Sequence, residues 1–133
     1  MLKKMPYISL PKALLLLRIS ISLVFFTHAM MRVLNGSLDR FGSFLNLKGL
    51  LFGTALVWMI TAFELIGGIL LALGKYTQLV CLGFLVILLM GIILIHFSQG
   101  WFVGEHGTGG MEYSFILIMA LITVMSGEKQ NSH

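Results

Sequence analysis

The sequence predicts an all-α integral membrane protein, a four-helix bundle formed by a single transmembrane domain over residues 1–133. Two observations predict this fold class. The chain is 58% hydrophobic and only 11% charged, with a mean hydropathy of +0.98, whereas a soluble domain is about half apolar and about a quarter charged. The apolar residues also form long runs between short polar segments, and a soluble domain could not bury so much apolar surface.

The four expected helices follow from the length of these runs, since a spanning helix needs about 20 mostly apolar residues. The first lies between Lys12 and Arg32, and the second contains Glu64 within an otherwise apolar run. The fourth is short unless it begins near Thr108 or Met111. We expect the helices at about residues 13–31, 51–73, 79–97 and 108–126.

The segments between these helices differ in character. After the first helix, the spacing of apolar residues predicts a short amphipathic helix on the membrane surface, carrying Leu38, Phe41, Phe44, Leu45 and Leu47. The next link, residues 74–78, is so short that the helices it joins should be antiparallel neighbours. The last loop, residues 98–110, is rich in glycine and should dip back toward the bundle.

The basic residues indicate an orientation, because Lys and Arg are enriched in cytoplasmic loops. With the N-terminus inside, six of them fall on the inner side: Lys3, Lys4, Lys12, Arg18, Lys75 and Lys129. Three fall on the outer side: Arg32, Arg40 and Lys48. Both termini are therefore expected in the cytoplasm.

Charge and cysteine content exclude other classes of protein. The net charge is +4, but the basic residues flank apolar runs and form no stripe interleaved with aromatic residues, so nucleic-acid binding is not expected. The single cysteine, Cys81, rules out an internal disulfide and a Cys-x-x-Cys redox pair. The partners that we expect are the lipid bilayer and either another protein or further copies of this chain.

Ionisable residues inside the apolar runs are the candidate functional residues. A charged side chain at the bilayer centre costs about 2.5 to 3.5 kcal/mol, so such residues face the bundle interior and find partners. Thr61, Glu64 and Gly68 lie on one face of the second helix, and Gly67 and Gly68 allow a neighbouring helix to approach closely. Glu64 should therefore point inward.

The other candidates come from the remaining helices. His28 and His96 lie near the outer ends of the first and third helices, and Glu112 and Tyr113 begin the fourth at the same side. Arg18 and Arg32 share a stripe with His28. We expect an outer-leaflet polar pocket from these seven residues: Arg18, His28, Arg32, Glu64, His96, Glu112 and Tyr113. The alternative is a network that only stabilises the bundle.

Four segments of the chain resemble the DoxX family of small four-helix membrane proteins. They are "LLLLRISISLVFFTHAMMRV", "AFELIGGILLALGKYTQL", "ILIHFSQGWF" and "GGMEYSFILIMALI". The order and spacing of these segments carry the resemblance. The chain departs from the family at Ala29, where Gly is usual, and it has Arg32 where Lys is common. An Arg in place of Lys keeps the positive charge but donates hydrogen bonds with a different geometry.

The resemblance implies a multi-pass protein of the bacterial inner membrane that is associated with oxidoreductases. In the leading hypothesis, the pocket binds a quinone or another small molecule, His28 and His96 donate to its oxygens, and Glu64 or Glu112 relays protons. The chain would then be a subunit of a membrane oxidoreductase. The alternative is a noncatalytic helper or receptor that recruits a partner through residues 32–48. A metal or haem site is a third hypothesis, but the His and Glu residues form no ligand motif and we assign no metal ligands.

Overall fold

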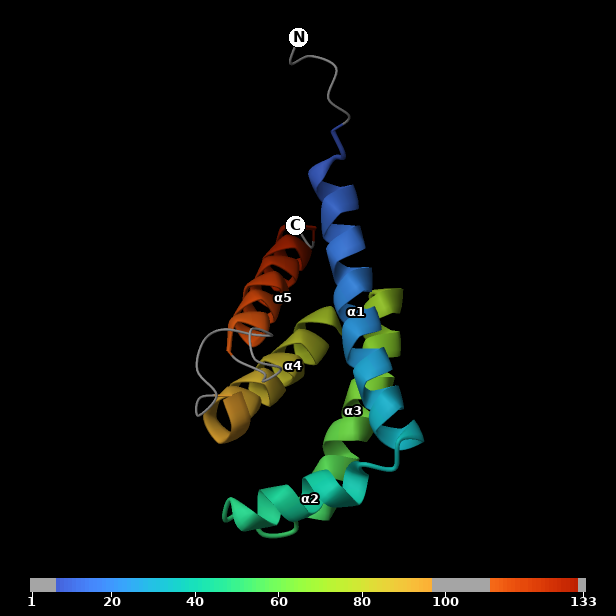
Figure 1. Cartoon of the computed structure of the whole chain (residues 1–133). Helices are drawn as coiled ribbons and strands as arrows, with labels where there is room; N and C mark the ends of the chain where they lie inside the picture. Colours follow the sequence, from blue (N-terminus) through green and yellow to red (C-terminus); the bar gives the residue numbers. More distant parts are fainter. Residues whose placement is uncertain (1–6, 97–110, 132–133) are drawn as a thin grey trace.

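The computed structural model describes residues 7–96 and 111–131, and this part of the chain is helical, with no strand. Figure 1 shows the arrangement. The elements are α1 (Leu10–Leu34), α2 (Leu38–Leu47), α3 (Gly53–Leu73), α4 (Thr77–Gly91), the π-helical turn η2 (Ile92–His96) and α5 (Glu112–Asn131). The predicted all-α class is confirmed.

Three of the described helical segments have the length and apolar character needed to cross a membrane: Leu10–Leu34, Gly53–Leu73 and Thr77–Leu94. The apolar part of α5, Glu112–Gly127, is shorter. Large apolar side chains are exposed along these helices, among them Leu23, Met59 and Ile93. Such surfaces suit lipid rather than water, which agrees with the composition of the chain.

The first helix is longer than expected because both ends extend beyond the apolar run. Pro11 lies in the first turn of α1, where its missing N–H breaks no intrahelical hydrogen bond. At the other end, α1 continues past Arg32 to Leu34. It stops at Asn35-Gly36, where Gly36 adopts a left-handed φ of 64°.

Helix α2 lies crosswise at the end of α1 and α3 (Figure 1). Its existence was predicted, but its apolar side packs on the protein: Leu38 and Leu45 are buried in a cluster with Val57 of α3. The contact with α3 is close. A Cβ at Gly42 would lie 2.6 Å from the Cα of Thr54, and the side-chain oxygen of Asn46 accepts a hydrogen bond of 2.8 Å from the Gly53 N–H.

The core is centred on Phe84 of α4. Its ring stacks on Phe25 of α1, with 3.9 Å between centroids, and is perpendicular to the ring of Phe63 of α3, with 5.6 Å between centroids. The glycine pair of α3 makes this packing possible: Gly67 faces Phe84, while Gly68 faces Phe26 and the Ser22 carbonyl of α1. The expected close approach of neighbouring helices at this pair is confirmed.

The start of α1 and the end of α5 lie at the same end of the molecule (Figure 1). A Cβ at Gly127 of α5 would lie 2.6 Å from Cδ1 of Leu14 in α1. The turn between α3 and α4 is also at this end, since Gly74 packs against Arg18. That this end faces the cytoplasm stays a prediction.

Candidate functional site

An ion pair links the two helices that carry the predicted polar residues. Nη1 of Arg32 in α1 lies 3.1 Å from Oε2 of Glu64 in α3, and it also donates a hydrogen bond of 2.8 Å to the Thr61 hydroxyl. The side chains are shielded: 12% of Arg32 and 3% of Glu64 is exposed. Thr61 and Glu64 are three residues apart on one face of α3, so one guanidinium nitrogen reaches both.

Arg32 is also held from α2 and its preceding turn. Its guanidinium carbon lies 5.6 Å from the centroid of the Phe41 ring, within the range of a cation–π interaction. The hydroxyl of Ser37 donates a hydrogen bond of 3.3 Å to the Arg32 carbonyl. The arginine therefore connects α1, α2 and α3 at one point.

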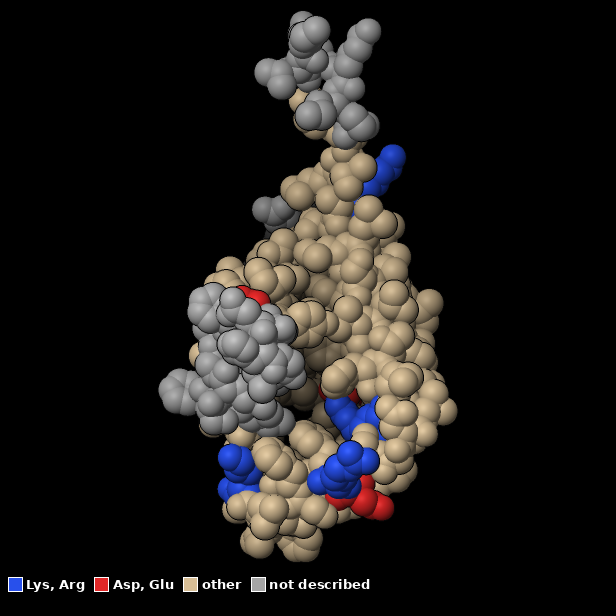
Figure 2. Space-filling model, viewed as in Figure 1, with Lys and Arg blue, Asp and Glu red and all other residues tan. Residues whose placement is uncertain are grey.

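A cavity of about 620 Å³ opens beside this ion pair. All the described helices and η2 contribute to its lining. Figure 2 shows a hollow on this face, with basic and acidic atoms at its edge. Its polar or charged lining residues are His28, Arg32, Ser37, Arg40, Glu64, Tyr113 and Ser114.

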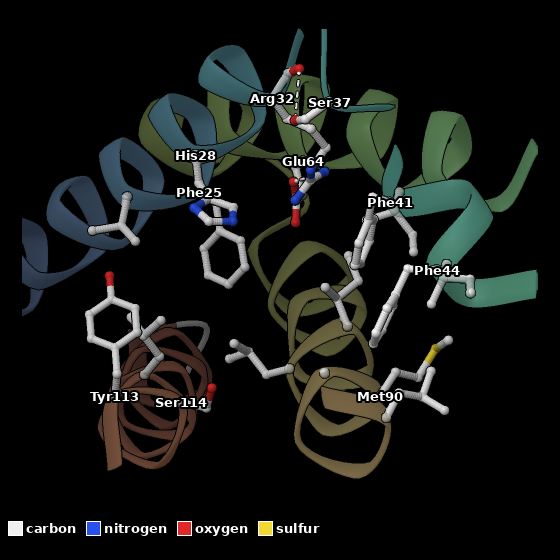
Figure 3. Close-up of a pocket in the computed structure, with 18 of the residues that line it drawn as sticks. Phe25, His28, Arg32, Ser37, Phe41, Phe44, Glu64, Met90, Tyr113 and Ser114 are labelled. Atoms are coloured by element: carbon white, nitrogen blue, oxygen red, sulfur yellow. Dashed lines mark hydrogen bonds and ion pairs between the residues drawn. The ribbon is translucent and has the colours of Figure 1, made fainter. Parts of the chain in front are cut away.

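Apolar and aromatic side chains form most of the cavity wall. Phe25 enters from α1, Phe41 and Phe44 from α2, and Met90 from α4 (Figure 3). The Phe41 and Phe44 rings are nearly parallel, with 6.3 Å between their centroids. Small-molecule sites are usually apolar concavities of about 300 to 1,000 Å³ with a few convergent polar groups, and this cavity has that composition.

The structure brings together four of the seven predicted site residues. His28 and Arg32 from α1, Glu64 from α3 and Tyr113 from α5 all line the cavity. In Figure 3, the His28 ring and the Glu64 carboxylate enter it from the same side, opposite Tyr113. Residues from three separate helices therefore line one cavity.

The other three predicted residues are placed differently. Arg18 lies at the opposite end of α3, where a Cβ on Gly74 would be 3.1 Å from its Nη1. Glu112 begins α5 and is half-buried, but it does not line the cavity. The side chain of His96 lies outside the described part of the structure.

Sequence reasoning missed the contribution of α2. Phe41 and Phe44 follow the i, i+3 spacing of an amphipathic helix, which we assigned to the membrane surface, and Arg40 was counted only for orientation. In the structure these residues line the cavity, because α2 folds under α3 at the Gly42–Thr54 contact. Gly42 and Gly53 were the available signals of that contact.

Among residues 7–96 and 111–131, no group of three or more His, Cys, Asp or Glu side chains is arranged to hold a metal ion. The metal hypothesis depended on two histidines and two glutamates, of which His28 and Glu64 line the cavity.

The comparison with protein families agrees with the helical membrane architecture. A model of the DoxX family matches residues 13–97 of the 133-residue chain, which covers most of α1 and all of α2, α3, α4 and η2, and includes His28, Arg32 and Glu64. No curated protein matches the chain, and no solved structure matches it. The family match covers more than half of the sequence, and the chain belongs to the DoxX family of membrane proteins.

Proposed function

We propose that the protein binds a small amphiphilic molecule in the cavity between α1, α2, α3, α4 and α5, and that a quinone is the first ligand to test. The observation that carries this proposal is one apolar cavity of about 620 Å³ with a buried Arg32–Glu64 pair in its wall. Three membrane-spanning helices surround it, so a lipid-soluble molecule would reach it from the bilayer.

The lining supports a ligand with a polar head and an apolar body. The guanidinium of Arg32 and the ring N–H of His28 are donors for carbonyl oxygens. Phe25, Phe41 and Phe44 provide apolar surface for a ring or an alkyl tail. Glu64 would accept or release a proton at the head group, since a carboxyl group can serve as a relay.

The proposed role is that of a subunit in a redox system of the bacterial inner membrane. The only cysteine, Cys81, is fully buried in the core and belongs to no dithiol. Electrons to or from a bound quinone would therefore come from another protein or a cofactor. This places the ligand-binding step in this chain and the electron transfer in its partner.

The test is extraction of small molecules from the purified protein, with quinones detected by their ultraviolet absorbance and mass. The wild-type protein should carry quinone, and His28→Ala should carry several-fold less. Thr27→Ala is the matched control, because Thr27 is an exposed neighbour that does not line the cavity. Absence of quinone from the wild type, together with no effect of added quinone on thermal stability, would contradict the proposal.

A noncatalytic helper is the second candidate, and the turn between α2 and α3 favours it. Leu47, Leu51 and Phe52 at this turn are 88%, 83% and 81% exposed, beside the exposed Lys48. A partner protein would cover these apolar side chains. Amine-reactive crosslinking at Lys48 in membranes should capture that partner, and Lys48→Gln should abolish the product.

A further inference from the structure

The second carboxylate oxygen of Glu64, Oε1, indicates which chemical groups a ligand of the cavity would carry. Oε2 of Glu64 is bound to Arg32, whereas Oε1 forms no hydrogen bond with the described residues. Only 3% of the Glu64 side chain is exposed, and the residue lines the cavity. Figure 3 shows the carboxylate directed into the cavity space. A carboxylate oxygen that faces a cavity accepts a hydrogen bond from any group that enters it with an O–H or N–H, so a ligand with such a donor would be favoured.

The charges around the cavity favour a neutral donor over an anion. Arg32 is compensated by Glu64 at 3.1 Å, so the pair has no net charge. A ligand carboxylate would have to share Arg32 while lying next to the Glu64 carboxylate, and like charges at that separation repel. Arg40 also lines the cavity, but it is exposed, so solvent screens its charge.

The side chains near the ion pair favour a ring as the carrier of that donor. Phe25 lines the cavity, and its ring already stacks on Phe84 at 3.9 Å, which fixes its orientation. Phe41 lies beside the Arg32 guanidinium on the other side. A planar head group between these rings would gain offset-stacked or edge contacts, and a hydroxyl on it would lie close to Glu64.

We propose that Glu64 makes the cavity selective for a neutral, hydroxyl-bearing aromatic head group, whose O–H donates to Oε1 of Glu64. This inference rests on the proposed function, since it requires that the cavity binds an amphiphile. It adds that the preferred form carries a hydrogen-bond donor, as a phenol or a dihydroxybenzene does. A ligand with acceptors alone, such as an ether, supplies no donor to Oε1.

The test compares three probes that share a nonyl chain and differ in the head group. They are 4-nonylphenol, its methyl ether 4-nonylanisole, and 4-nonylbenzoate. Binding to the full-length protein in lipid nanodiscs is measured by equilibrium dialysis, with empty nanodiscs as the reference for partition into lipid. We expect the phenol to bind about tenfold more tightly than the ether, because a donor to a buried carboxylate contributes on the order of a tenfold affinity difference. The benzoate should bind more weakly than the phenol.

We expect the variant Glu64→Gln to change the order in which the probes bind. Its amide oxygen takes the place of Oε2 toward Arg32, and the amide N–H₂ then faces the cavity as a donor. The affinities of the phenol and the ether should become nearly equal, or the ether should bind more tightly. Thr27→Ala, a neighbour of His28 outside the cavity lining, should keep the wild-type preference.

The outcomes separate this inference from the proposed function. Equal binding of phenol and ether to the wild type, or tightest binding of the benzoate, would overturn the selectivity while leaving a ligand-binding cavity. Failure of all three probes to bind above the empty nanodisc would overturn both. The comparison among probes uses the wild-type protein alone, so it decides the question even where Glu64→Gln does not fold.

Discussion

At the scale of single residues, Arg32 and Glu64 explain how the chain tolerates charge inside an apolar bundle. Each charge alone would be expensive to bury, but the two lie 3.1 Å apart, and Thr61 accepts a further hydrogen bond from the same guanidinium nitrogen. The planar guanidinium of Arg32 also lies over the Phe41 ring, a contact that a lysine ammonium would make with different geometry.

Replacing one partner of the pair should destabilise the protein more than replacing both. We expect Arg32→Met to lower the free energy of unfolding by about 3 to 5 kcal/mol, because it leaves the Glu64 carboxylate buried and uncompensated. Arg32→Met with Glu64→Met should recover most of that loss. Equilibrium unfolding in mixed micelles, arranged as a double-mutant cycle, measures the coupling. Strictly additive losses would contradict a direct interaction of the two side chains.

At the scale of elements, α2 forms part of the cavity wall. It is a short amphipathic helix whose apolar residues pack on α3, and its aromatic residues close one side of the cavity. Its position depends on the absence of side chains at Gly42 and Gly53, where the backbones of α2 and α3 nearly touch. Asn46 then accepts a hydrogen bond from the Gly53 N–H, at the start of α3.

A methyl group at Gly42 should separate α2 from α3. A Cβ there would lie 2.6 Å from the Cα and 2.8 Å from the N of Thr54, and backbone atoms cannot rotate away. We expect Gly42→Ala to lower the free energy of unfolding by about 1 to 3 kcal/mol, as overpacking does. Ser43→Ala, at an exposed neighbouring position on α2, is the control and should change it little. Equal stability of the two variants would show that α2 does not depend on this contact.

At the scale of the whole molecule, the helices combine exposed apolar surfaces with a cavity near the α2 end. The opposite end holds the start of α1, the α3–α4 turn and the end of α5. Arg18 lies there against Gly74, at the C-terminus of α3, where a cation is favourable for the helix dipole. Arg18 and Arg32, which lie on the same stripe of α1, are therefore placed toward opposite ends of the bundle.

The orientation in the membrane gives a further prediction. Lys75→Cys, in the α3–α4 turn, should react with a membrane-impermeant maleimide only after the cytoplasmic side is opened. Ser43→Cys, on α2, should react in intact spheroplasts. Both positions are exposed, and the native Cys81 is buried and should give little background. Labelling of Lys75→Cys in intact spheroplasts would reverse the predicted topology.

The sequence by itself determined the fold class and the inward direction of Glu64. Long apolar runs leave few structures other than spanning helices, because backbone groups in lipid must bond within the segment. The spacing of Thr61, Glu64 and the glycine pair then identified the face of α3 that packs inward. His28, Arg32 and Tyr113, which line the cavity, were predicted to share a pocket for a related reason: polar groups in apolar segments need partners.

Only the tertiary structure decided which of these residues meet. Arg18 and Arg32 lie on the same stripe of α1, and periodicity cannot tell which one reaches Glu64; the depth at which α1 packs on α3 selects Arg32. The same holds for α2, whose amphipathic pattern suits a lipid surface and a protein surface equally well. Helical spacing specifies which face of a helix is apolar, whereas its partner depends on contacts such as Gly42–Thr54 between segments distant in the sequence.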